Sequence, residues 1–303
     1  MDKPTFSIVI PVAPDRECKV LDSIKFLNYP PKKFEVIVIR GKNPSLNRNL
    51  GFKKSKGKYI VFLDDDVIVP KDYLSIAEKF FAKHDDVDIV GGPQLTPPES
   101  SYFSRLCGYA LSSRFGSWNL SKRYLIHKKS KFDAGEEYLT SANLICKRKV
   151  LEKTKFNPDL YPGEDPDFLN RAKRYFKLAY YPKLFVYHKR RETIKGFVKQ
   201  IYRYGLARPQ FSSFSYLLRK FYFFVPSAFL VYIVLLPYLA ILNPLFVLPF
   251  VVYFCLCSVY AISIFKKEKK LSVFILFPII LFIMHVSYGA GFLVSFIKKF
   301  LNL

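Results

Sequence analysis

Acidic side chains are scarce in this sequence, which has 24 Asp and Glu residues against 48 Lys and Arg and a formal net charge of +24. So basic a chain attracts polyanions such as anionic lipid headgroups, sugar diphosphates or nucleic acid. No recognised nucleic-acid-binding motif accompanies the charge, so nucleic acid is not an expected partner. A basic excess is also common on solvated surfaces, and the charge alone does not choose between the other two.

Cysteines are few, and their spacing forms no pattern. The five are scattered along the chain, at Cys18, Cys107, Cys146, Cys255 and Cys257. No pair of them stands in the company that a zinc site needs. We therefore expect reduced, structural thiols in a cytoplasmic environment rather than a disulfide framework.

Charged residues are missing from three long stretches near the C-terminus, 221–242, 245–265 and 271–297, the last of which contains His285. A helix needs about 20 apolar residues to cross a bilayer. Each stretch is long enough, so the sequence predicts three transmembrane helices. The alternative is a very apolar soluble core, which charge-free runs of this length do not favour.

The charges around these stretches predict the orientation of the chain. Basic residues are dense in 189–220 and in the loop 266–270, whereas the loop at Asn243 and Pro244 is uncharged. Positive segments stay in the cytoplasm, and the first five residues lack the apolar core of a signal peptide. We expect a multi-pass protein of the cell membrane whose N-terminal domain is cytoplasmic.

One pair of charges disagrees with this topology. Lys298 and Lys299 follow the third apolar stretch, so they would lie outside the cell if that stretch crossed the membrane fully. A re-entrant third stretch is the alternative.

The first 95 residues alternate strand and helix signals. Continuous apolar runs predict strands at 6–12, 34–39, 59–63 and 87–91, and the segments between them predict helices at 16–28, 45–55 and 71–83. Buried strands alternating with helices indicate an α/β fold with a parallel sheet covered on both faces. Ligands of such sheets bind beyond the carboxyl ends of the strands.

The remainder of the soluble part is less regular. Strands are expected at 139–146 and 184–187, and helices at 149–154 and 165–176. An amphipathic helix is predicted at 193–206, and its basic residues suggest that it lies along the membrane surface. We expect a cytoplasmic domain at 1–218, with 193–218 as its interfacial segment, and a membrane domain at 219–303.

Three consecutive acids, Asp64, Asp65 and Asp66, directly follow the predicted strand at 59–63. In an extended chain, residues two apart point the same way, so Asp64 and Asp66 can converge on one point. Two carboxylates at one point need a cation between them, and Mg²⁺ or Mn²⁺ suits such oxygen ligands. A solvated acidic turn is an equally available explanation of the triplet alone.

Three further motifs bear acidic or basic residues. Glu164 and Asp165 stand at the start of a predicted helix, where the helix dipole stabilises carboxylates. Asp165 could there accept a proton from a hydroxyl group, although simple capping explains the pair as well. Gln200 and Arg203 share one face of a helix, and an arginine offers a fork of donors that suits phosphate. His188 follows a short strand and could be a neutral imidazole ligand of the metal.

The order and spacing of these motifs resemble one large family. The motifs that carry the resemblance are FSIVIPV at 6–12, NRNLG at 47–51, GKYIVFLDDD at 57–66, IVGGP at 89–93, GEDPDF at 163–168, QIYRY at 200–204 and YGLAR at 204–208. Over residues 6–208 the chain resembles the inverting glycosyltransferases of family 2, which have the Rossmann-like GT-A fold. Its ending and its C-terminal spans look like exopolysaccharide members of the succinoglycan type.

The resemblance implies a role for each motif. Asp165 matches the catalytic base, with Glu164 beside it. The metal ligands for Mn²⁺ or Mg²⁺ would be Asp64, Asp66 and His188. The residues that the resemblance implies in donor binding are Pro11, Glu17, Arg48, Asp64, Asp65, Gln200 and Arg203. The implied partners are a nucleotide-diphosphate sugar, with UDP-sugars ranked first, and a lipid-linked or glycan acceptor at the membrane.

The chain departs from the family at one position. After the second strand, members usually carry acids that hold the nucleotide, but here the chain reads Ile39, Arg40, Gly41 and Lys42. GDP or another nucleotide therefore remains open, as does a donor held mostly through its phosphates.

Two other functions remain in view. A nucleotidyltransferase would carry a glycine-rich loop after the first strand, and this chain has none there. A non-catalytic membrane protein that binds anionic lipid or a partner enzyme is the alternative from another class.

Overall fold

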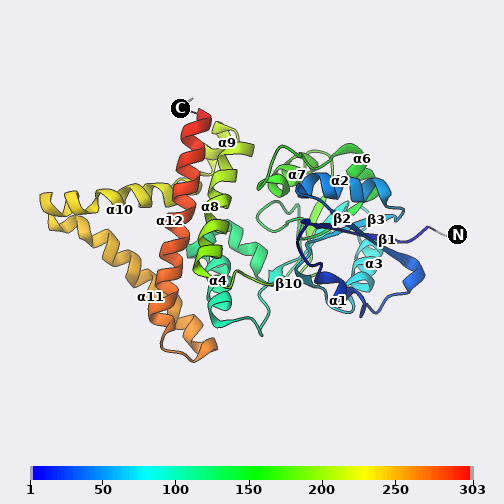
Figure 1. Ribbon diagram of the computed structural model, residues 1–303, viewed down its shortest axis with the longest axis horizontal. Coiled ribbons are helices and arrows are strands. Elements are labelled where there is room, and N and C mark those ends of the chain that lie inside the picture. The colour runs from blue at the N-terminus through cyan, green and yellow to red at the C-terminus, as the bar shows by residue number, and fades with distance from the viewer. Residues whose placement is uncertain (1–2, 301–303) are drawn as a thin grey trace. The chain divides into compact units, whose positions relative to one another are not determined.

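The computed structural model describes residues 3–300, which form two compact units (Figure 1). The first unit comprises Met1–Glu99 and Asn119–Lys189, and the second comprises Ser100–Trp118 and Arg190–Leu303. The predicted domains, 1–218 and 219–303, are divided at a different residue. The difference arises because one segment from the middle of the chain and the helix after residue 193 pack with the C-terminal helices.

The first unit is built around a seven-stranded sheet with the order β2-β1-β3-β8-β5-β9-β7. Its strands are β1 (Phe6–Val12), β2 (Phe34–Arg40), β3 (Tyr59–Leu63), β5 (Ile89–Gly91), β7 (Lys131–Phe132), β8 (Asn143–Lys147) and β9 (Leu178–Tyr180). A smaller sheet has the order β4-β10-β6, with β4 (Val67–Ile68), β6 (Gln94–Leu95) and β10 (Val186–His188).

Helices cover both faces of the large sheet, as the continuous apolar strands predict (Figure 1). The helices of this unit are α1 (Val20–Ile24), η1 (Pro31–Lys33), α2 (Pro44–Lys54), α3 (Tyr73–Lys83), η2 (Trp118–Tyr124), α6 (Arg148–Lys153) and α7 (Glu164–Ala172). Alternate residues of β1 and β3 face opposite sides, so Ile8 joins a core with α1 and α3 while Phe62 joins a second core with α6 and α7. Such double burial requires strands that are apolar throughout.

The sheet is mixed rather than parallel, which corrects the expectation from the sequence. Strands β1, β2 and β3 are parallel, but β8 pairs antiparallel with both β3 and β5, and β7 pairs antiparallel with β9. The segment between β5 and β8 brings the chain back to the same end of the strands at which β5 ended. The next strand, β8, must therefore run in the opposite direction.

The second unit consists of helices. They are α4 (Tyr102–Ser112), α5 (Arg114–Ser117), α8 (Ile194–Phe211), α9 (Phe214–Arg219), η3 (Phe221–Phe223), α10 (Val225–Leu242), η4 (Pro244–Val247), α11 (Leu248–Glu268) and α12 (Val273–Phe300). Helix α8 is longer than predicted, and its apolar residues Phe197 and Ile201 are buried. The position of 193–218 at a membrane surface stays a prediction.

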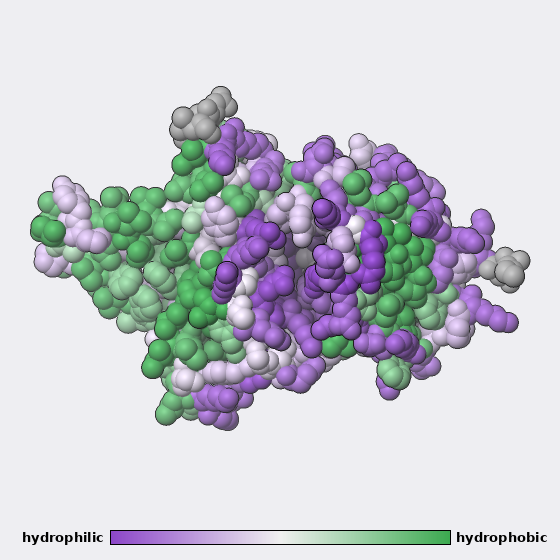
Figure 2. Space-filling view, in the orientation of Figure 1, coloured by the Kyte–Doolittle hydropathy of each residue, from purple (hydrophilic) through white to green (hydrophobic). Residues whose placement is uncertain are grey.

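Three helical segments are long and apolar enough to cross a membrane. They are Phe221–Leu242, Pro244–Glu268 and Val273–Phe300, in good agreement with the three stretches expected from the sequence. Hydrophobic side chains dominate the visible surface of α10 and α11 (Figure 2).

Gly205 of α8 packs against the backbone of α12. A Cβ atom at this position would stand 2.2 Å from the carbonyl oxygen of Tyr288 and 2.7 Å from the amide nitrogen of Phe292. We expect Gly205→Ala to push the two helices apart and to cost about 1–3 kcal/mol of stability, measured as a lower Tm in detergent. The control is Gly196→Ala in the same helix, where the nearest atom is Oγ1 of Thr193 at 3.1 Å and alanine improves helix propensity. Equal Tm values for the two variants would contradict the packing.

Candidate active site

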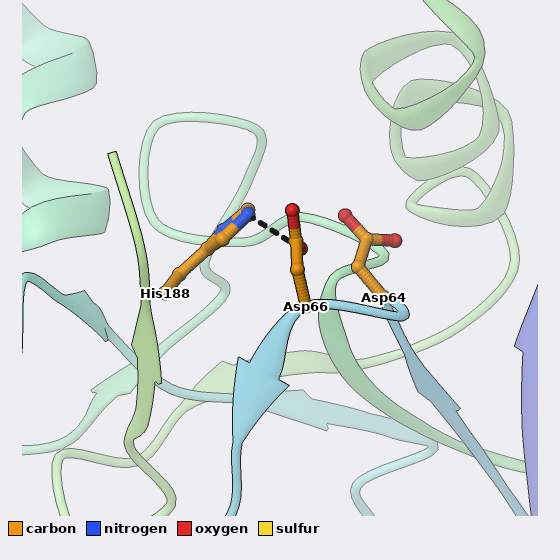
Figure 3. A group of neighbouring side chains, drawn as sticks. All are labelled: Asp64, Asp66 and His188. Carbon is orange, nitrogen blue, oxygen red and sulfur yellow. Dashed lines mark ion pairs between the residues drawn. The ribbon is translucent and has the colours of Figure 1, made fainter. Parts of the chain in front are cut away.

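The acid triplet lies directly beyond the carboxyl end of β3. Ligand atoms of Asp64, Asp66 and His188 all lie within 4.8 Å of one another. The carboxylates of Asp64 and Asp66 point to the same side, and the ring of His188 faces Asp66 (Figure 3). The structure thus brings together the three residues that the sequence singled out, while their role as metal ligands stays a prediction.

The small sheet explains how His188 reaches the triplet from far along the chain. Strand β10 pairs antiparallel with β4, and His188 stands opposite Val67, the residue after Asp66. Nε2 of His188 lies 3.0 Å from Oδ1 of Asp66. Its Nδ1 lies 2.9 Å from Oε1 of Gln94, an acceptor that requires the proton on Nδ1. Nε2 is therefore the ring nitrogen that can face a cation.

These atoms fit a divalent cation. Two carboxylates and an imidazole nitrogen, with the second ring nitrogen held by an amide oxygen, form a donor set that Mn²⁺ accepts readily and Mg²⁺ accepts through its oxygens. Within residues 3–300 this is the one cluster of three such side chains.

Asp65 points away from the cluster and is buried. Its Oδ1 lies 3.2 Å from NH1 of Arg16, whose NH2 donates to Oδ2 of Asp66 at 2.8 Å. Burial raises the pKa of Asp65 to about 6. Burial would also raise the pKa of Asp66, but His188 and Arg16 hold the pKa of that carboxyl below its usual range. Arg16 therefore stabilises the negative charge of the triplet from the loop after β1.

Arg48, on α2, connects the two acidic motifs. Its side chain is only 4% exposed, and it lies 2.9 Å from Oδ1 of Asp64 and 3.2 Å from Oε1 of Glu164. Burial and, after it, the charge of Asp165 raise the pKa of Glu164 to about 7, although the charge of Arg48 lowers it. The guanidinium thus offsets negative charge on α7 and after β3 at once.

Asp165 stands in the first turn of α7, beside the Arg48 pair. Oγ of Ser141 donates a hydrogen bond to its Oδ1. Ser141 is itself buried, so this oxygen is held in place. The role of Asp165 as a catalytic base stays a prediction.

The other predicted donor residues are placed as follows. Pro11 is buried in β1, and Glu17 is exposed in the loop after it, with its carboxylate 3.7 Å from Lys19. Gln200 and Arg203 belong to α8 in the second unit. A role in donor binding stays a prediction for all four.

Sequence reasoning missed Arg16, Gln94 and Ser141, which contact Asp66, His188 and Asp165. No local pattern marks them, because each reaches its partner through a tertiary contact. Arg40 offers a partial explanation for the acid that is missing after β2. Its NH1 donates to the carbonyl oxygen of Arg16 at 2.8 Å, so it holds the loop that carries Arg16.

The comparisons with known proteins agree with this fold. The family described as Glycosyltransferase like family 2 matches residues 2–206. That match covers more than half of the chain, and the protein therefore belongs to glycosyltransferase family 2. No curated protein matches the sequence.

Two solved structures are similar to this chain. The mannosyltransferase PcManGT from Pyrobaculum calidifontis, in complex with GDP-Man and Mn²⁺, is similar over 98% of this chain and 88% of its own, with a TM-score of 0.55 and 14% identity. S. aureus TarS 1-349, in complex with UDP, matches 67% of this chain with a TM-score of 0.46 and 16% identity. The match covers 64% of that TarS fragment, which is less than two thirds of its length. The likeness to PcManGT shows the GT-A fold.

Removing the Arg48 charge should leave the buried carboxylate of Glu164 and the partly buried one of Asp64 without their shared partner. We expect Arg48→Met to cost about 3–5 kcal/mol of stability, measured by thermal unfolding without added metal. Adding Glu164→Gln should restore part of the loss, because one of the two charges is then gone. The control is Arg40→Met, an exposed arginine whose loss should cost under about 1 kcal/mol. A similar loss for both arginine variants would contradict the bridging role of Arg48.

Proposed function

We propose that this protein transfers a sugar from a nucleotide-diphosphate sugar to an acceptor at the membrane, with inversion at the anomeric carbon. The observation that carries the proposal is the cluster of Asp64, Asp66 and His188, which Arg48 links to Glu164 beside Asp165, in a chain of glycosyltransferase family 2. A cation site next to a carboxylate base is the arrangement that transfer from a sugar diphosphate needs.

The donor is a nucleoside diphosphate sugar, with UDP- and GDP-sugars as the two leading classes. The Mn²⁺ and GDP-Man of PcManGT support this class. Arg40 and Lys42 follow β2 where the family usually has acids, which supports a donor held largely through its phosphates.

Different residues of the chain would bind the cation and accept the proton. Asp64, Asp66 and His188 would hold Mn²⁺ or Mg²⁺, which neutralises the charge of the leaving diphosphate when it is bound. Asp165 accepts the proton of the attacking acceptor hydroxyl at Oδ2, while Ser141 holds Oδ1. A single displacement of this kind inverts the configuration of the sugar. The sugar that is transferred in this proposal is a hexose.

The acceptor is a lipid-linked glycan, and the protein is a multi-pass protein of the cell membrane. Three apolar helical segments support attachment to the membrane. The dense positive charge of 189–220 and 266–270 supports a cytoplasmic catalytic domain.

Donor turnover is the direct test of this function. The detergent-solubilised protein, given UDP-, GDP- and dTDP-sugars with Mn²⁺ and a membrane lipid extract, should release one nucleoside diphosphate. Release should stop with a chelator and in the Asp64→Ala/Asp66→Ala variant. No release from any donor, together with no nucleotide binding in a titration, would instead favour a non-catalytic membrane protein.

The base is tested separately with Asp165→Asn. A general base contributes about 100- to 10,000-fold in rate, so we expect transfer to fall by that factor while donor binding persists. Asp167→Asn is the matched control, because Asp167 lies in the same helix turn but pairs with Arg171. Normal transfer by Asp165→Asn would rule out this base.

A further inference from the structure

The three apolar helical segments differ in how much protein surrounds them. Only 6% of the apolar window is buried in the first, and 17% in the second, but 50% is buried in the third, Val273–Phe300. Residues 280–293 of α12 include no exposed side chain. The middle of α12 is therefore largely covered by protein, whereas α10 and α11 present large apolar surfaces, with Val234, Ile241 and Val259 each more than 60% exposed.

The helix that encloses α12 is itself charged. Gly205 of α8 and Gly291 of α12 each bring the two backbones into direct contact. The opposite face of α8 exposes Lys195, Lys199 and Arg203. If α12 crossed a bilayer, its middle would lie in hydrocarbon, and these three cations beside it would lie there too. Charges at that depth are expensive and seldom tolerated.

A polar contact halfway along α12 leads to the same conclusion. His285 makes two hydrogen bonds inside the unit: its Nε2 donates to the carbonyl oxygen of Phe115 at 3.1 Å, and its Nδ1 accepts from the hydroxyl of Tyr253 at 2.9 Å. Phe115 belongs to α5, a short helix that also carries Arg114. The ionisable residue of the third apolar stretch thus faces a protein segment rather than lipid.

The C-terminal end of α12 is fixed to the end of α8. Nζ of Lys299 donates to the carbonyl oxygens of Pro209, Gln210 and Ser212 at 2.7, 2.9 and 3.0 Å. These carbonyls belong to the last turn of α8, where a cation is favoured by the helix dipole. Lys299 therefore lies at the end of α8, and the two helices end at the same level.

The loop that leads into α12 is fixed to α4. Glu268, the last residue of α11, accepts from Nε of Arg105 at 2.8 Å and from the hydroxyl of Tyr109 at 2.9 Å. Helix α4 is in turn joined to the segment before α8, because Oγ of Ser104 donates to the carbonyl oxygen of Arg190 at 3.0 Å. Both ends of α12 are thus attached to one polar layer formed by α4 and α8.

We propose that α12 lies along the membrane surface with α4 and α8, and that only the hairpin formed by α10, η4 and α11 enters the bilayer. The occupant of the apolar surface on this hairpin is lipid, since no charged residue occurs between Lys220 and Lys266. Lys298 and Lys299 then lie on the same side as the basic segments 189–220 and 266–270. This inference rests on the membrane attachment in the proposed function and not on the transfer chemistry.

The experiment maps the side of the membrane on which single cysteines react. In a background with Cys18→Ser and Cys255→Ser, the variants Lys56→Cys, Asn243→Cys and Lys298→Cys are treated with a membrane-impermeant maleimide. Inverted and right-side-out vesicles are compared. We expect Lys298→Cys to be labelled from the same side as Lys56→Cys. Labelling of Lys298→Cys from the opposite side would overturn the proposal, whatever the outcome of the turnover assay.

A second measurement does not depend on membrane insertion of a cysteine variant. Lys299→Gln removes the charge that caps α8 through three hydrogen bonds, and Lys298→Gln removes the same charge from the preceding residue, which does not bond these carbonyl groups. We expect a lower Tm in detergent for Lys299→Gln and an unchanged Tm for Lys298→Gln. Equal Tm values would contradict the attachment of the two helix ends and, with it, the surface position of α12.

Discussion

The buried ion pairs of Arg48 are the interaction on which the rest of the site depends. A guanidinium that is almost fully removed from water is stable only if anions surround it, and here Asp64 and Glu164 do so. These three residues come from α2, from the end of β3 and from the start of α7. Their attraction therefore fixes the position of α7 relative to the acid triplet. As a consequence, Asp165 is placed beside the cluster of Asp64, Asp66 and His188. The two acidic motifs form one site because both pair with the guanidinium of Arg48.

Much of this arrangement could be predicted from the sequence, and the reason is local geometry. Strands β1 and β3 are apolar runs buried along their whole length, as a doubly covered sheet requires, and alternation along an extended chain places Asp64 and Asp66 together. The direction of β8 could not be predicted, because it depends on where the long segment after β5 returns to the sheet. The position of His188 beside the triplet could not be predicted either, because it depends on the pairing of β10 with β4, which are far apart in the sequence.

The residues that the sequence did not reveal act through loops. Arg16 reaches Asp65 and Asp66 because Arg40 holds the backbone of the loop after β1. An arginine at the end of β2 is an exception to the family pattern when the sequence alone is considered, yet in the structure it organises the loop that neutralises the triplet. Arg40 thus has a structural role at the end of β2, where the sequence departs from the family pattern.

Hydropathy has a similar limit at the C-terminal end. An apolar helix is excluded from water equally well by lipid and by a neighbouring helix, so composition gives the same prediction for α10, α11 and α12. The three helices differ in their tertiary contacts. Gly205 and Gly291 allow the backbones of α8 and α12 to approach closely, so α8 covers α12. The middle of α12 is covered in this way, and the charges on the far side of α8 make a position inside the hydrocarbon unfavourable there. The contradiction between Lys299 and the positive-inside rule disappears, since the lysine follows a helix that never leaves the side on which it began.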